Sequence, residues 1–175
     1  MPNWFVMFVK TGRELKVEKQ IKEKFDIDMF YPFTPMLETL YKTAGKVRKE
    51  TKPMFPGYVF VESDISSHDF IQYTRSMIST SNDIIRLLKY GDENEIAMRD
   101  EERSTFLSFF NDDHCFESSS GIIVGDRVII KSGPLKGWEN KVRKIDRHKR
   151  IVWIEMDFMG DNRLVSVALE IVEKI

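Results

Sequence analysis

The chain has 175 residues and a formal net charge of −1, and 42% of its residues are hydrophobic and 31% charged. These values are typical of one large or two small globular domains, and they exclude an intrinsically disordered chain. The only cysteine, Cys115, excludes an intrachain disulfide and fits a reducing cytoplasm, and without a leader or a long apolar run we expect neither secretion nor a membrane partner.

An apolar run opens the chain and has the length of a strand. It covers Trp4–Val9, far fewer residues than the roughly 20 that a membrane helix needs. Thr11 and Glu14 follow with the spacing of a capping box, in which side chains bond the first free N–H groups of a helix. We therefore expect a helix from residue 12 to about residue 25, with an apolar face formed by Val17, Ile21 and Phe25.

The segment after this helix is expected to be extended. Residues 29–42 alternate loosely between apolar and polar side chains, which is the pattern of a strand. Ala44-Gly45 then predicts a tight turn, so that residues 43–51 are expected to form a protruding hairpin.

Apolar spacing predicts two further helices in the first part of the chain. One contains Phe70 and Met77 and begins near a serine at 66 or 67, and the other covers about residues 97–110, with Phe106 and Phe110 facing the sheet. A strand at 84–88 lies between them. This order predicts an α+β domain in which helices flank an antiparallel sheet.

Residues 111–121 are polar, rich in serine and without periodicity. We interpret them as a flexible linker between a first domain, residues 1–110, and a second domain, residues 122–175. In the second domain, short runs of Val, Ile, Trp and Phe alternate with turn residues, which predicts a small SH3-like β-barrel. Its five strands are expected at residues 127–131, 141–145, 150–156, 163–167 and 169–172.

The sequence lacks the patterns of an enzyme. Its three histidines are dispersed without metal-ligand spacing, no phosphate-binding loop is found, and Cys115 lies in the expected linker rather than in an ordered basic environment. We expect no catalytic residue, no metal ion and no cofactor.

The segment Lys52–Val61 is the most informative part of the chain. Pro53 and Pro56 restrict the backbone, and Gly57 permits a turn that a side chain would obstruct. The segment therefore predicts a rigid aromatic platform at the start of a strand, left uncovered by its own fold. A strand start with a buried aromatic ring is an equally open interpretation of the residues alone.

Two sets of motifs resemble the NusG-like transcription elongation factors. Trp4-Phe5-Val6, Gly12-x-Glu14-x-x-Val17 and Phe55-Pro56-Gly57-Tyr58-Val59 resemble the amino-terminal (NGN) domain of these proteins. Gly125-Asp126-Arg127-Val128 with Ser132-Gly133-Pro134-Leu135 resembles their KOW motif. The motifs stand in the family's order over nearly the whole chain. The resemblance implies a monomeric, cytoplasmic transcription factor.

In that family the NGN domain docks on the clamp helices of the largest catalytic subunit of bacterial RNA polymerase. The resemblance places Trp4, Phe55 and Tyr58 in the docking face, with Met54 where the family often has another aromatic residue. A few such anchors dominate the binding of a helix in an apolar groove. The implied function is elongation or antitermination, in which pausing or termination is suppressed.

Basic segments are the candidate nucleic-acid contacts. The hairpin carries Lys46, Arg48 and Lys49, which we expect near duplex DNA unless they only solvate its tip. By resemblance, Arg75 and Ser76 face the non-template DNA strand. The last set lies on one strand and turn and is expected to bind nascent RNA, or else to protect a strand edge from aggregation. This set comprises Lys141, Arg143, Lys144, Arg147, Lys149 and Arg150.

The resemblance leaves the protein partners of the second domain open. Phe158 and Met159 match the loop with which the general factor contacts a ribosomal small-subunit protein or the Rho helicase. Departures from the general factor favour a specialised antiterminator paralogue similar to the LoaP group. A housekeeping NusG role with Rho-linked termination, and a ribosome-associated KOW protein that binds ribosomal RNA, are the alternatives.

Overall fold

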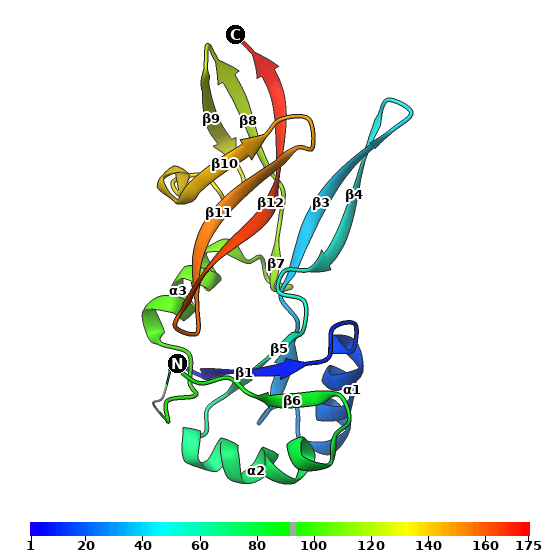
Figure 1. The fold of residues 1–175 in the computed structure, drawn as a ribbon, viewed down its shortest axis with the longest axis vertical. Coiled ribbons are helices and arrows are strands. Elements are labelled where there is room, and N and C mark those ends of the chain that lie inside the picture. Colours follow the sequence, from blue (N-terminus) through cyan, green and yellow to red (C-terminus); the bar gives the residue numbers. More distant parts are fainter. Residues whose placement is uncertain (92–93) are drawn as a thin grey trace. The chain divides into compact units, whose positions relative to one another are not determined.

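The computed structural model describes residues 1–91 and 94–175, which form two compact units (Figure 1). The first unit, Met1–Pro35 and Phe55–Arg103, contains β1 (Asn3–Val9), α1 (Glu14–Lys24), β2 (Tyr31–Phe33), β5 (Tyr58–Ser63), α2 (Ser67–Thr80) and β6 (Ile84–Leu87). The second unit, Met36–Met54 and Ser104–Ile175, contains β3 (Met36–Thr43), β4 (Lys46–Pro53), β7 (Cys115–Phe116), β8 (Ser119–Val124), β9 (Arg127–Ser132), a 3₁₀ turn (Glu139–Lys141), β10 (Val142–Asp146), β11 (Ile151–Phe158) and β12 (Asp161–Lys174). The division falls within α3 (Asp100–Phe109).

The first unit is a four-stranded sheet, in the order β2-β5-β1-β6, with helices packed against it. Its central strands β1 and β5 are antiparallel, and Phe5 lies opposite Val61. Because side chains alternate between the two faces of a strand, Phe5, Met7 and Val9 share one face. They form a buried core with apolar residues of α1 and α2, which confirms the α+β architecture predicted from the sequence.

Helix α1 begins without the predicted capping box. Arg13 is its N-cap and makes no side-chain capping bond, so Thr11 and Glu14 do not pair as expected. Glu14 is instead buried, and its Oε1 accepts a hydrogen bond from the backbone N–H of Gly57 at 2.7 Å. The carboxylate serves a distant loop rather than its own helix end, and this contact cannot be read from local spacing.

Helix α2 confirms its sequence pattern. Ser66 is the N-cap, and its side chain accepts from the backbone N–H of Asp69. Phe70 is fully buried, and its ring stacks on Phe5 with centroids 3.9 Å apart. Tyr73, one turn further along the helix, is 50% exposed, and its ring lies edge-on to the core residue Phe30 with centroids 6.0 Å apart.

The predicted hairpin is present and is longer than expected. β3 and β4 pair antiparallel from Met36 opposite Pro53 to Thr43 opposite Lys46. Ala44 and Gly45 connect them with φ of 51° and 80°. Positive φ at both positions is the type I′ geometry that suits the twist of two-residue hairpins.

The segment expected to be an aperiodic linker has regular structure. The backbone of β7 pairs in parallel with the start of β3, so that Cys115 lies beside Met36, and Cys115 is buried. Asn111 Oδ1 accepts from the backbone N–H groups of Asp113 and Cys115, a local turn that aims the chain along β3. The linker prediction followed the polar composition and missed this pairing, because the partner strand lies far away in sequence.

The second unit carries a five-stranded sheet in the order β10-β11-β12-β8-β9, consistent with the SH3-like prediction. Two strand predictions need correction: the last two predicted strands form the single strand β12, and β8 begins inside the expected linker. β8 pairs in parallel with the end of β12, Ser119 beside Leu169. Phe106 of α3 meets Phe158 of β11 edge to face, with centroids 6.3 Å apart.

The stack of Phe70 on Phe5 leads to a stability prediction. Phe70→Ala should lower the free energy of unfolding by about 3–5 kcal/mol, because a large buried ring leaves a cavity. Gln72→Ala, at an exposed position of the same helix, should change it by about 0.5 kcal/mol or less. Urea unfolding followed by circular dichroism measures both variants, and equal losses would contradict the assigned core.

Candidate interaction surfaces

The sheet of the first unit has a second aromatic face, opposite its core. Successive side chains of β1, β2 and β5 point to opposite faces of the sheet, so those that do not point toward the helices lie on this second face. Cross-strand register brings Tyr31 opposite Glu62 and Phe33 opposite Phe60. The aromatic residues of this face are Trp4, Phe8, Tyr31, Phe33, Tyr58 and Phe60.

Trp4 is the centre of this aromatic face. Its ring lies edge-on to Phe33 and Phe60, with centroids 5.1 and 5.9 Å apart, and its Nε1 donates to a Glu62 carboxylate oxygen at 2.7 Å. Trp4 is fully buried, and Phe55 and Met54 are 4% and 5% exposed. The expectation that these three side chains stay uncovered is therefore wrong for this structure: for Trp4, ring packing and a carboxylate partner satisfy both its apolar and its polar part.

Two tyrosines form the accessible part of the aromatic face. Tyr31 is 41% exposed, and Tyr58 is half-buried. Tyr58 stacks on Phe8 with centroids 5.2 Å apart, and the Arg86 guanidinium lies 5.9 Å from the Phe8 ring centroid. Tyr58 is thus the one predicted anchor that the structure leaves partly accessible.

The turn before Tyr58 is held by three hydrogen bonds. Val9 N–H donates to Gly57 O at 2.8 Å, Gly57 N–H donates to Glu14, and Tyr58 N–H donates to Phe55 O at 3.2 Å. Gly57 has φ of 89°, and a Cβ there would lie 3.2 Å from both Thr11 Oγ1 and Val9 O. The glycine that the sequence analysis assigned to a turn is therefore required by backbone angle and by space.

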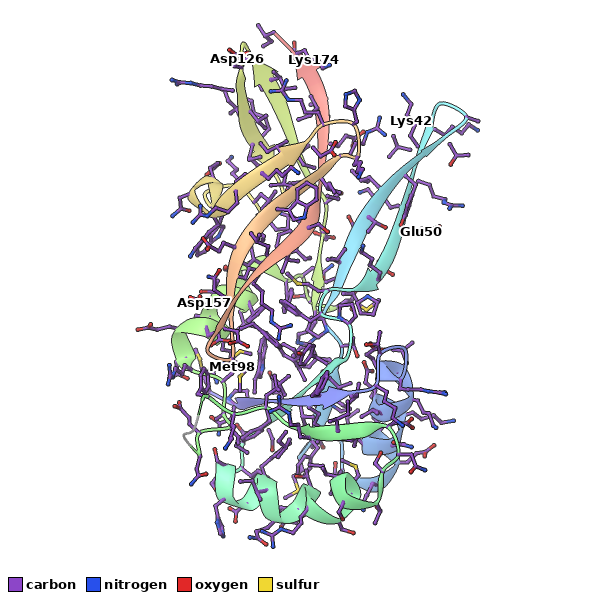
Figure 2. The ribbon with its side chains drawn as sticks, viewed as in Figure 1. Lys42, Glu50, Met98, Asp126, Asp157 and Lys174 are labelled. Atoms are coloured by element: carbon purple, nitrogen blue, oxygen red, sulfur yellow. The ribbon has the colours of Figure 1, made fainter. Side chains whose placement is uncertain are left out.

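The cations of the β3–β4 hairpin are solvent-exposed, and some are paired. Arg48 forms an ion pair with Glu50 at 2.6 Å, and Lys49 lies 3.8 Å from Glu38. Lys46, beside the turn, makes no ion pair within the described part of the chain. Figure 2 labels Lys42 near the end of this hairpin and Glu50 farther down β4.

The basic segment around β10 divides into engaged and exposed cations. Arg143 Nε donates to Glu155 at 2.7 Å, and the Lys144 ammonium lies 5.0 Å from the Trp153 ring centroid. Arg147 and Lys149 are exposed in the turn between β10 and β11, and neither side chain forms an ion pair among the described residues. Two further members of the predicted set, Lys141 and Arg150, are half-buried.

An aspartate shapes the turn that carries Arg147 and Lys149. Asp146 Oδ1 accepts from the Lys149 backbone N–H at 3.0 Å, and this bond, with the nearby Lys149 and His148 charges, lowers the Asp146 pKa. The only acid of this basic segment thus orders the turn.

Helix α2 carries the predicted DNA contacts, and its C-terminal end lines a hollow to which those two residues do not contribute. Arg75 and Ser76 are exposed on α2. A hollow of about 320 Å³ lies between α1 and the end of α2, lined by Lys16, Gln20, Lys24, Met77, Thr80, Ser81, Asn82 and Asp83. Lys16 Nζ lies 2.9 Å from Asp83 Oδ2 and lowers the Asp83 pKa. Sequence offered no signal, because the two walls are about 60 residues apart.

The loop predicted to meet a ribosomal protein or Rho is not an open apolar loop. Phe158 and Met159 are both buried. Met159 and Gly160 make the tight β11–β12 turn with φ of 49° and 86°, and the Arg163 guanidinium lies 4.8 Å from the Phe158 ring centroid. The partner surface predicted there remains a prediction.

Two features are absent from the residues that the structure describes. Among them, no group of three His, Cys, Asp or Glu side chains is placed to hold a metal ion. Within the same residues, no helix combines the length and apolar character needed to cross a membrane.

The chain thus combines an α+β unit that bears an aromatic sheet face with a strand-rich unit that bears a basic turn. The family model of the transcription termination factor NusG matches residues 2–107, so the chain belongs to the NusG family. A Staphylococcus carnosus protein, "Transcription termination/antitermination protein NusG", is 24% identical, with 98% of this chain and 95% of that protein covered. The protein of the same name from Staphylococcus aureus (strain Mu50) is 23% identical over the same shares.

The turn at Gly57 gives a second testable expectation. Gly57→Ala should destabilise the first unit by about 1–3 kcal/mol, because the alanine must hold a positive φ while its Cβ crowds backbone. Gly45→Ala has a similar φ but open space around the Cβ, so it should cost about 1 kcal/mol. Thermal unfolding of the two variants measures the difference, and an equal loss would show that space at Gly57 is not limiting.

Proposed function

We propose that the protein binds transcribing bacterial RNA polymerase through its aromatic sheet face and acts in the cytoplasm as an antitermination factor. Family membership supports the transcription role, and the aromatic face supports a helix as the partner. In this proposal residues 1–110 are the polymerase-binding domain, residues 122–175 form the KOW domain, and the docking residues are Trp4, Met54, Phe55 and Tyr58. No catalytic step is required.

The aromatic face has the composition of a protein-binding centre. Aromatic rings bury large areas at a low cost in side-chain entropy, and a few central rings carry most of the binding energy. Tyr58 and Tyr31 are accessible to a first contact, whereas docking through Trp4 and Phe55 requires that these rings become accessible to the clamp helices. A factor that bridges the polymerase cleft would favour its closed, elongating state over paused states.

The exposed cations of the β10–β11 turn support the nucleic-acid part of the proposal. Arg147 and Lys149 present charge without a competing ion pair among the described residues, and arginine both pairs with phosphate and stacks on unpaired bases. Arg143 is weaker as a contact, because Glu155 already binds it. We assign nascent RNA to this turn and upstream DNA to the exposed cations of the hairpin, among them Lys46.

The housekeeping NusG role is the second candidate function. Nearly full-length coverage by proteins named for both termination and antitermination favours it. A genome-wide profile of polymerase association separates the two: occupancy at a few long operons supports the specialised factor, and broad occupancy supports the housekeeping role. Sedimentation with ribosomal particles independent of Phe55 and Tyr58 would instead indicate a ribosome-associated protein.

Removal of two rings tests the docking surface. Phe55→Ala combined with Tyr58→Ala should weaken association with RNA polymerase at least about 100-fold, since two central aromatic anchors typically contribute about 2 kcal/mol or more each. Co-purification and biolayer interferometry with core polymerase measure this loss. Tyr41→Ala with Tyr73→Ala removes two exposed rings from other surfaces and is the matched control. Unchanged binding of the first variant, with circular dichroism showing a folded chain, would exclude this surface.

Salt dependence tests the RNA contact. Arg147→Gln with Lys149→Gln should reduce the magnitude of the log–log salt slope of leader-RNA binding by about 1–2, roughly one unit for each phosphate that is no longer neutralised. Lys19→Gln with Lys22→Gln makes the same change in net charge on α1, where both lysines are ion-paired, and should leave the slope unchanged. An equal reduction of the slope in both variants would assign the binding to net charge alone, and an unchanged slope in the Arg147 and Lys149 variant would exclude this turn.

A further inference from the structure

Glu14 is a buried charge without a role in the proposed contacts. Glu14 is only 4% exposed, although it lies in the first turn of a surface helix, where a carboxylate is ordinarily solvated. The one hydrogen bond that involves its side chain within the described residues comes from Gly57 N–H at 2.7 Å. A buried charge needs a specific reason, because its removal from water costs several kcal/mol unless it is hydrogen-bonded.

The partner of Glu14 explains this burial. Gly57 is buried, and its N–H points away from the β1–β5 ladder, where only its carbonyl is paired, with Val9 N–H. Without Glu14 the Gly57 N–H would be an unsatisfied buried donor. The carboxylate therefore completes the hydrogen bonding of a turn whose neighbouring residues, Phe55 and Tyr58, carry two of the proposed docking rings.

We propose that Glu14 is the positioning residue of the polymerase-docking turn: its carboxylate holds the Gly57 backbone so that Tyr58 and Phe55 are presented in a single orientation. This inference rests on the proposed function. Glu14 itself touches no partner and acts only through the Gly57 N–H group. Two hydrogen bonds hold the Gly57 peptide groups, this one and the bond from Val9 N–H to Gly57 O.

Reach, not charge, decides which variants retain the contact. Glutamine keeps an acceptor oxygen at the same distance from the backbone, whereas aspartate keeps the charge but is one methylene shorter. Binding should therefore decrease in the order wild type, Glu14→Gln, then Glu14→Asp and Glu14→Ala. A role of the negative charge in attracting a basic partner would instead rank aspartate above glutamine.

The experiment measures the affinity of the full-length protein for core RNA polymerase by biolayer interferometry. Glu14→Gln should bind within about threefold of wild type, and Glu14→Asp and Glu14→Ala about tenfold or more weaker, as the loss of roughly one hydrogen bond to a charged group implies. In ¹⁵N–¹H spectra the Gly57 amide should lie downfield in wild type and move upfield in the aspartate and alanine variants. A matched control is Glu18→Ala, which removes another α1 carboxylate, the acceptor of Thr34 Oγ1 at 2.5 Å.

Each outcome has a defined meaning. If Glu14→Asp binds like wild type while the Phe55 and Tyr58 double variant does not bind, the positioning role is wrong and the docking surface stands. If the double variant binds like wild type, the docking surface itself is wrong, and the Gly57 amide shift alone reports whether Glu14 orders the turn. Glu18→Ala should lower the melting temperature without changing affinity, and an equal loss of affinity there would reduce Glu14 to general helix stability and overturn the proposal.

Discussion

The antiparallel pairing of β1 with β5 is the constraint on which the first unit depends. Its register puts Phe5 and Val61 side by side on one face, and Trp4 beside Glu62 on the other. A shift by one residue would exchange the two faces, because side chains alternate along a strand. The same strand pair therefore supplies the core against α1 and α2 and also the aromatic face that we assign to a partner.

Function and stability compete at this aromatic face. Rings that bind a partner well also bury themselves well, and Trp4 is held by two neighbouring rings and a carboxylate. Tyr58 is different, because its half-buried ring is placed by the rigid turn before it. The buried ring of Trp4 therefore stabilises the aromatic face, and the half-buried ring of Tyr58 is the part of it that a partner can reach.

The charges of the second unit are organised by their acidic neighbours. Glu155 and Glu50 neutralise arginines that composition alone would count as nucleic-acid contacts. Asp146 uses its carboxylate to bind the backbone of its own turn, and the side chains of Arg147 and Lys149 form no ion pair within the described chain. Because Arg143 is already paired, the candidate nucleic-acid contacts of this basic segment are the exposed cations of the β10–β11 turn. An unpaired cation contributes more to binding, since it neutralises a phosphate and releases a counterion without first breaking an ion pair.

The sequence by itself determined the elements whose signals are local. The spacing of Val17 and Ile21, the cap at Ser66 and the turn at Ala44-Gly45 each depend on a few adjacent residues, and all are present in the structure. The family motifs likewise sit in short segments. These features follow from backbone geometry and side-chain alternation, which operate over one or two turns of chain.

Only the tertiary structure decided which groups are buried and which meet. Glu14 bonds Gly57 across 43 positions, β7 pairs with β3, and Trp4 packs under Phe33. Local patterns predicted a capping box at Glu14 and no regular structure at Cys115, and these two expectations were wrong for the same reason. A polar or aromatic side chain has several equally good local partners, and long-range packing selects among them because it excludes water and leaves no buried donor unsatisfied.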